Sequence, residues 1–91
     1  MNSKLDNNLS TPLNKQLENI LINEILNENY CENDRFYTER ELAIRYQTST
    51  FTVKSAIENM IKKNILYRKP RKGTFIRKSE VTYNQQLAKH P

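Results

Sequence analysis

Residues 36–63 read FYTERELAIRYQTSTFTVKSAIENMIKK and predict two helices joined by a tight turn. Near the start of this stretch, Thr38 and Glu41 have the spacing of a capping box. In that motif the Thr hydroxyl accepts a hydrogen bond from the N–H three residues on, while the Glu side chain reaches back. Residues 47–48 supply the turn, and Ser49 can then cap the second helix.

Both helices have the apolar spacing of an element that buries one face. The first is only about two turns long, and its buried face is expected to consist of Leu42, Ala43 and Tyr46. The second repeats apolar residues at spacings of three and one, which is the pattern of an amphipathic helix. Its apolar positions are Val53, Ala56, Ile57, Met60 and Ile61.

An earlier helix is predicted over residues 12–27, because Leu and Ile recur there on one face. Thr11 is expected to cap this helix, with Pro12 as its first residue. Asn29 suits a left-handed conformation just beyond its end, since Asn is the usual substitute where Gly is absent. Residues 30–36 then form a connecting loop.

The segment after the last helix predicts a hairpin. Asn64 stands where a left-handed residue would end the helix. Residues 65–68 and 74–77 are β-prone, and residues 69–73 between them read KPRKG, a basic stretch rich in turn formers. The expected fold is mainly α with a small β-hairpin: three helices plus a two-stranded wing, which is the winged helix-turn-helix order.

The length of the chain allows one small domain. Its 91 residues are too few for a second domain of ordinary size. We expect a flexible N-terminus over residues 1–10, the winged domain over residues 11–78 and a polar tail over residues 79–91. No apolar run approaches the roughly 20 residues that span a bilayer, and the start lacks a signal peptide pattern. A cytoplasmic protein without membrane contact is therefore expected.

Residues that carry catalysis or bind metals are scarce. Cys31 and His90 are the single cysteine and histidine, so they form no metal-ligating cluster. A glycine-rich phosphate-binding loop needs several glycines, and this chain has one. We expect no enzyme, no metal site and no cofactor.

Basic charge is concentrated in one segment. The formal net charge is +5, yet residues 62–78 alone hold eight Lys or Arg side chains and no acid. A run of this kind is either a solvated face or a surface for a polyanion. On a winged helix the second interpretation has a mechanical basis, because the helix after the turn can enter the major groove of DNA. Arg71 and Lys72 would then lie against phosphates or in a minor groove.

The chain resembles the N-terminal domain of the GntR family over about residues 12–76. The resemblance rests on Pro12-Leu13, on FYTERELA at 36–43 for the family's LPSERELA, on QTSTFTVK at 47–54 for GVSRxTVR, and on KGTFI at 72–76 for the end of the wing. It implies that Arg40, Thr52 and Lys54 contact DNA together with Lys72 and Gly73. The full expected DNA-binding set is Arg40, Ser49, Thr50, Phe51, Thr52, Lys54, Arg71, Lys72 and Gly73.

Several positions depart from the family pattern. Thr50 replaces an arginine suited to bidentate guanine contact and Lys54 replaces another, so guanine readout should be weaker. Gln47 replaces the turn glycine and needs a strained or altered turn unless its φ is negative. Arg71 replaces a wing glycine. Only about a dozen residues follow the wing, where the family continues into a larger domain that binds an effector and dimerises.

Three hypotheses remain at this point. The first is a transcription regulator, a repressor rather than an activator, that binds a palindromic or repeated operator of double-stranded DNA as a homodimer, with no small-molecule effector site within this chain. The second is a winged-helix module of a replication initiation or plasmid-maintenance protein. The third, a winged helix used for protein contacts, is disfavoured by the acid-free wing. The operator, the regulated gene, the effector and the native oligomeric state stay open.

Overall fold

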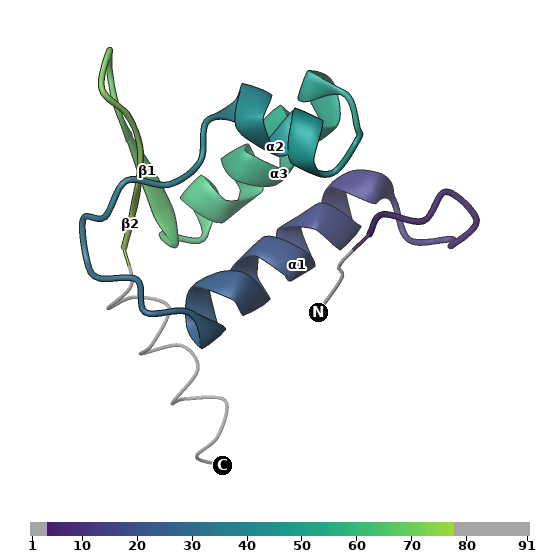
Figure 1. The fold of residues 1–91 in the computed structure, drawn as a ribbon, viewed down its shortest axis with the longest axis horizontal. Helices are drawn as coiled ribbons and strands as arrows, with labels where there is room; N and C mark the ends of the chain where they lie inside the picture. Colours follow the sequence, from purple (N-terminus) through teal and green to yellow (C-terminus); the bar gives the residue numbers. More distant parts are fainter. Residues whose placement is uncertain (1–3, 78–91) are drawn as a thin grey trace.

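The computed structural model describes residues 4–77 and has the predicted order of elements (Figure 1). The polar tail expected at residues 79–91 lies outside the described residues. The two strands pair antiparallel, so the predicted winged helix-turn-helix class, three helices and a two-stranded wing, is confirmed. The elements are α1 Leu13–Asn27, α2 Glu39–Arg45, α3 Thr50–Lys62, β1 Leu66–Lys69 and β2 Gly73–Ile76.

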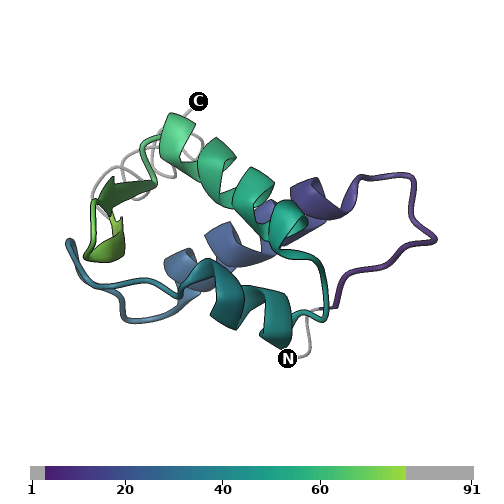
Figure 2. The same cartoon turned by 90° about the horizontal axis from the view of Figure 1, so that it is seen from above.

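The core lies where α3 packs against α1 and α2, with the hairpin closing one end (Figure 2). Most of the predicted inward positions are buried, whereas Ala43 and Ile61 are half-buried at its edge. Removing this much apolar surface from water is the main stabilising contribution to a domain of this size. The fully buried apolar side chains are Leu17, Leu21, Ile25, Leu42, Val53, Ala56, Met60 and Ile76.

Two of the three predicted helix starts are confirmed. The backbone N–H of Glu41 donates to the Thr38 hydroxyl at 3.1 Å, and the Glu41 carboxylate accepts from the Thr38 N–H at 2.8 Å. Ser49 Oγ accepts from the N–H of Thr52 at 3.0 Å. Both motifs use residues three apart in the chain, so they form wherever the local sequence allows them.

The predicted cap of α1 by Thr11 is wrong. Pro12 itself is the N-cap, with an extended backbone (φ −57°, ψ 148°), and no side chain caps this helix. The Gln16 side-chain amide instead donates to the Thr11 carbonyl at 2.7 Å and exchanges two hydrogen bonds with the backbone of Asp6. Gln16 therefore holds the preceding chain across the start of α1, in place of a local cap.

The two predicted left-handed positions differ in outcome. Asn64 has φ 61° and ends α3 as expected. Asn29 does not have positive φ, because Glu28 leaves α1 in an extended conformation (φ −100°, ψ 167°) and no reversal is needed there. The positive φ occurs at Asn33 instead (φ 73°), where the loop turns toward the hairpin.

The loop before α2 forms a short third edge of the hairpin, which the sequence did not predict. Arg35 pairs with Phe75 in an antiparallel bridge. The N–H groups of Asn33 and Phe36 donate to the carbonyls of Ile76 and Thr74, each at 2.8 Å. A two-stranded hairpin is marginally stable alone, so this edge contributes to holding the wing in place.

A buried carboxylate joins α1 to the C-terminal end of α3. Glu18 is fully buried, and its oxygens accept hydrogen bonds from Lys63 Nζ and, at 3.4 Å, from Asn59 Nδ2. Lys15 Nζ lies 3.7 Å away. The hydrogen bond with Glu18 raises the pKa of Lys63 above its ordinary value of 10.5. The ammonium is thus charged throughout the neutral range, and its stabilising contribution is lost only as pH rises through that raised pKa.

We predict that Lys63→Met lowers the free energy of unfolding by about 2 kcal/mol at pH 7, because the Glu18 carboxylate then stays buried without its main partner. Urea unfolding measures this change. Lys62→Met is the matched control, since Lys62 is the exposed neighbour on the same helix and should change the value by less than about 0.5 kcal/mol. Equal losses in the two variants would contradict the role given to Glu18.

Candidate nucleic-acid interface

The first turns of α3 present a continuous outer surface. Thr50, Phe51 and Lys54 are exposed, and the Phe51 side chain has 81% of its area accessible. The opposite side of the same helix is fixed in the core by Val53 and Ile57. Since successive residues of an α-helix are about 100° apart, burying the second pair forces the first three outward.

Ser49 and Thr52 belong partly to the helix cap. The Ser49 hydroxyl donates to Thr52 Oγ1 at 3.0 Å, and Thr52 is half-buried beside it. The Thr52 hydroxyl therefore has its proton available as a donor while its oxygen is already engaged. The hydroxyl of Thr52 is thus more restricted in its partners than that of the exposed Thr50.

Arg40 is exposed in the first turn of α2, and no carboxylate of the described residues pairs with it. Its neighbour Glu39 instead binds Arg68 of β1, with Arg68 Nη2 donating to Glu39 Oε2 at 2.9 Å. This ion pair links the start of the helix-turn-helix to the wing. It also pairs Arg68, one of the eight basic side chains of residues 62–78 that were predicted to face a polyanion, with a carboxylate.

The predicted basic tip of the wing is formed by Arg71 and Lys72, which are both exposed in the turn between β1 and β2. Arg71 has φ 67° and Gly73 has φ 125°, so the turn needs two left-handed residues in three. The Lys72 N–H donates to the Lys69 carbonyl at 2.9 Å and closes the turn. The tip therefore carries its charge on a fixed turn.

The basic segment has fewer unpaired cations in the structure than a count along the sequence suggests. Lys63 is bound to Glu18 and Arg68 to Glu39, so neither is a free cation. Lys69 Nζ lies 5.0 Å from the Phe75 ring centroid, and Arg77 Cζ lies 4.5 Å from that of Tyr67. These two remain charged and exposed, at the outer side of the hairpin.

Gln47, at the turn between α2 and α3, has φ 53°. The sequence left two possibilities for this position, and the structure has the left-handed one. Its N–H donates to the Ile44 carbonyl at 3.3 Å, and the next residue, Thr48, donates to Ala43 at 3.0 Å. The turn thus keeps the geometry that favours glycine, with a side chain present.

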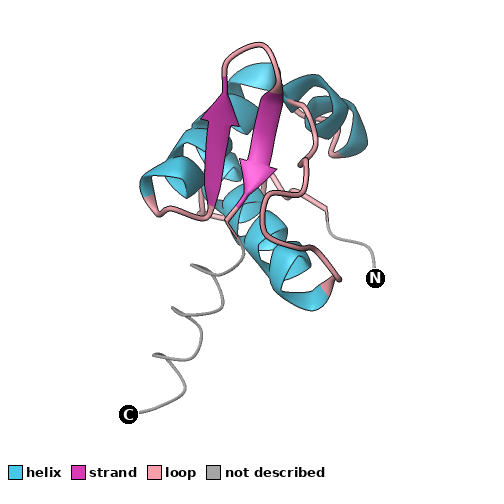
Figure 3. Ribbon diagram, turned by 90° about the vertical axis from the view of Figure 1, so that its left-hand side faces the viewer, coloured by secondary structure: helices cyan, strands magenta, loops and turns pink. Residues whose placement is uncertain are grey.

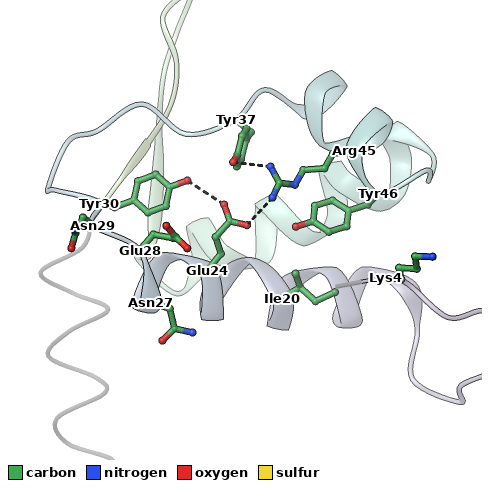
Figure 4. Close-up of a pocket in the computed structure, with 10 residues that line it drawn as sticks. All are labelled: Lys4, Ile20, Glu24, Asn27, Glu28, Asn29, Tyr30, Tyr37, Arg45 and Tyr46. Atoms are coloured by element: carbon green, nitrogen blue, oxygen red, sulfur yellow. Dashed lines mark hydrogen bonds and ion pairs between the residues drawn. The ribbon is translucent and has the colours of Figure 1, made fainter. Parts of the chain in front are cut away.

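A groove of about 830 Å³ lies between α1 and α2, away from the surfaces above (Figure 4). Figure 4 shows Glu24 between Tyr30 and Arg45: Tyr30 Oη donates to Glu24 at 3.2 Å, and an Arg45 nitrogen lies 3.8 Å from the other oxygen. Arg45 also donates to Tyr37 Oη at 3.0 Å, and burial raises the pKa of Tyr30. These polar groups satisfy one another, which is the arrangement of a structural network.

Neither a metal-ion cluster nor a membrane-crossing helix occurs within residues 4–77. No group of three His, Cys, Asp or Glu side chains there is arranged to hold a metal ion. None of the helices in that range has the length and apolar character to cross a membrane.

Residues 13–76 match the family described as bacterial regulatory proteins, gntR family. The chain belongs to the GntR family. The match covers every helix and strand described above, and the family is one of regulators and not of enzymes.

Individual relatives agree with this assignment. The uncharacterized HTH-type transcriptional regulator YurK of Bacillus subtilis (strain 168) is 37% identical over 73 residues, which are 80% of this chain and 30% of YurK. A GntR family transcriptional regulator from Listeria monocytogenes has the same fold, with a TM-score of 0.80 at 23% identity over 92% of this chain and 75% of that one. AraR(DBD) in complex with operator ORX1 gives a TM-score of 0.73 at 25% identity, covering 80% of this chain and 93% of that one.

The left-handed turn of this GntR domain generates a stability prediction. Gln47→Gly should raise the free energy of unfolding by about 0.5 kcal/mol, because removing Cβ relieves a left-handed strain of about 1–2 kcal/mol at a smaller entropic cost. Thermal or urea unfolding measures it. Glu58→Gly is the control, an exposed position inside α3 where glycine should cost about 1 kcal/mol. A loss at both positions would mean that the strain at Gln47 is negligible.

Proposed function

We propose that this chain is the DNA-binding domain of a bacterial transcription regulator, with α3 in the major groove and the hairpin on the neighbouring backbone. The observation that carries the proposal is the exposure of Thr50, Phe51 and Lys54 on one face of α3, beside a basic hairpin tip. An exposed phenylalanine offers an apolar edge that suits the methyl group of thymine.

Each expected site residue has a role in this proposal. Lys54 and Arg40 are the long donors for guanine or phosphate, and Thr50 and Thr52 supply short hydroxyl groups to base edges. Ser49 caps α3, whose free N–H groups favour a phosphate at that end. At the wing, Arg71, Lys72 and Gly73 meet the backbone or a minor groove.

Solved relatives support DNA as the partner. AraR(DBD) was solved in complex with operator ORX1, and this chain shares 25% of its residues and its fold. By analogy we propose that two copies bind a palindromic operator. We also propose that the protein acts in the cytoplasm, as a repressor. A role at replication origins has no such support among the relatives.

The chain spans 30% of the length of YurK. A regulator of that length has room for a further domain, so we propose that an effector, if the protein uses one, binds outside residues 1–91. The groove between α1 and α2 does not argue against this, because its polar groups already bind one another.

Selection of bound sequences from a random duplex pool tests the function directly. We expect an enriched motif with two-fold symmetry and half-sites about one helical turn apart. A motif without symmetry would contradict pairing of two copies. The absence of any affinity for duplex DNA at low salt would contradict the proposal as a whole and leave a protein-contact role.

Replacing Arg71 and Lys72 together by Ala should weaken binding to all sequences alike. The slope of log K against log salt should become shallower by about 0.9 for each phosphate that the variant no longer binds. Fluorescence anisotropy at several salt concentrations measures this slope, with Lys4→Ala as a control for net charge. A changed sequence preference with an unchanged slope would make the wing a reader of bases.

Thr50→Arg should create a guanine preference of about 1–3 kcal/mol at one position of the site, because arginine can donate two bonds to guanine. The unsubstituted protein should prefer A·T there. Arg40→Ala should remove a guanine preference that already exists. Binding at fixed salt to a panel of single-base variants measures these differences, and Thr50→Lys controls for charge without the planar fork. An unchanged panel for Thr50→Arg would mean that α3 does not dock in the major groove.

A further inference from the structure

We infer that the outer face of the hairpin carries a phosphate-binding site formed by Arg35 and Lys69, in addition to the basic tip of the wing. The inference rests on the proposed function, since the phosphate belongs to the DNA backbone. Arg35 was not among the residues that the sequence singled out, because it lies in the loop before α2, far from the wing along the chain.

The bridge between the loop and β2 brings Arg35 to this face. Arg35 is paired with Phe75, and directly paired residues of antiparallel strands point to the same side. The guanidinium then crosses to Gly73: Arg35 Nε and Nη2 lie 3.3 and 3.6 Å from the place that a Cβ of Gly73 would occupy. A Cβ at this position would be in tight contact with the guanidinium, so glycine favours this close approach.

Lys69 reaches the same place from the other strand. It is paired with Gly73 across the hairpin, and its Nζ lies 5.0 Å from the centroid of the Phe75 ring. The backbone of Arg35 is thus paired with Phe75 while its guanidinium lies beside Gly73. The backbone of Lys69 is paired with Gly73 while its ammonium lies over the Phe75 ring. Both cations thus lie over the part of the outer face formed by Gly73 and Phe75.

No carboxylate of residues 4–77 compensates this pair. Both side chains are exposed, and neither takes part in an ion pair among the described residues. The acid nearest to Arg35 in sequence, Asp34, accepts a hydrogen bond from the Cys31 N–H at 2.8 Å. An anion bound near both side chains would be attracted by each of the two positive charges. The arrangement thus fits an anion better than it fits the free protein.

The position of the pair favours a DNA phosphate. Figure 3 shows that no helix within residues 4–77 covers the outer face of the sheet, and that the loop lies beside β2. Gly73 follows Lys72 directly, so an anion held by Arg35 and Lys69 is next to whatever Arg71 and Lys72 contact. Double-stranded DNA repeats phosphates along both edges of each groove, about one charge per 1.7 Å of axis. A backbone at the tip therefore offers a further phosphate to this pair.

The first test is the salt dependence of Arg35→Gln binding to random duplex DNA. We expect a slope of log K against log salt that is shallower by about 0.9, as for one fewer neutralised phosphate. Lys4→Gln is the matched control, because it removes the same charge from the N-terminal segment and should leave the slope unchanged. Circular dichroism and backbone amide shifts of β1 and β2 confirm that the hairpin of the variant is intact.

The second test identifies the phosphate. Neutral methylphosphonates are placed one at a time in a selected binding site, and binding is measured for the unsubstituted protein and for Arg35→Gln. At one position, neutralisation should weaken the unsubstituted protein about tenfold and leave Arg35→Gln nearly unaffected. Arg35→Lys should restore part of the loss at that position.

The outcomes separate this inference from the proposed function. If the unsubstituted protein binds DNA but Arg35→Gln has the same slope, or no methylphosphonate is coupled to Arg35, the phosphate site is wrong and the DNA-binding function stands. If Arg35 bound a free anion and not a DNA phosphate, no methylphosphonate position would be coupled to Arg35 either. If the unsubstituted protein has no affinity for DNA, both proposals are overturned.

Discussion

The burial of one face of α3 against α1 and α2 is the constraint on which the rest of the structure depends. Val53, Ala56, Ile57 and Met60 have almost no exposed area, so the helix has a single rotation about its axis. That rotation decides which residues meet solvent. Ser49 fixes the helix at its first turn, while the carboxylate of α1 holds its last turn. Neither the outer surface nor the position of the wing is free to vary independently of this packing.

The elements themselves were predictable because their signals are local. The capping box of α2, the Ser49 cap and the left-handed Asn64 each involve residues within one turn, and all three occur as predicted. The two errors, at Thr11 and Asn29, have a different cause. At Thr11 a hydrogen bond from the Gln16 side chain replaced the cap, and at Asn29 the chain left α1 in an extended conformation. A periodic pattern of apolar residues reveals neither.

The site was predictable in part. Exposure of Thr50, Phe51 and Lys54 follows from the apolar spacing of α3, whereas their contacts with DNA stay predictions. The buried Glu18 and the bridging Arg35 could not be predicted, because each depends on residues about 40 positions away in the chain. A charge count along the sequence also overstates the free cations, since carboxylates from α1 and α2 engage two of them.

The third edge of the hairpin has a consequence for motion. Backbone hydrogen bonds tie residues 33–36 to β2, and the Glu39–Arg68 ion pair ties β1 to the start of α2. The wing and the first turn of α2 are therefore expected to open and close together as one cooperative unit, and not as a hinged flap on a fixed body. Hydrogen exchange of the Phe36 and Ile76 amides would then report the same opening free energy, set by that shared opening.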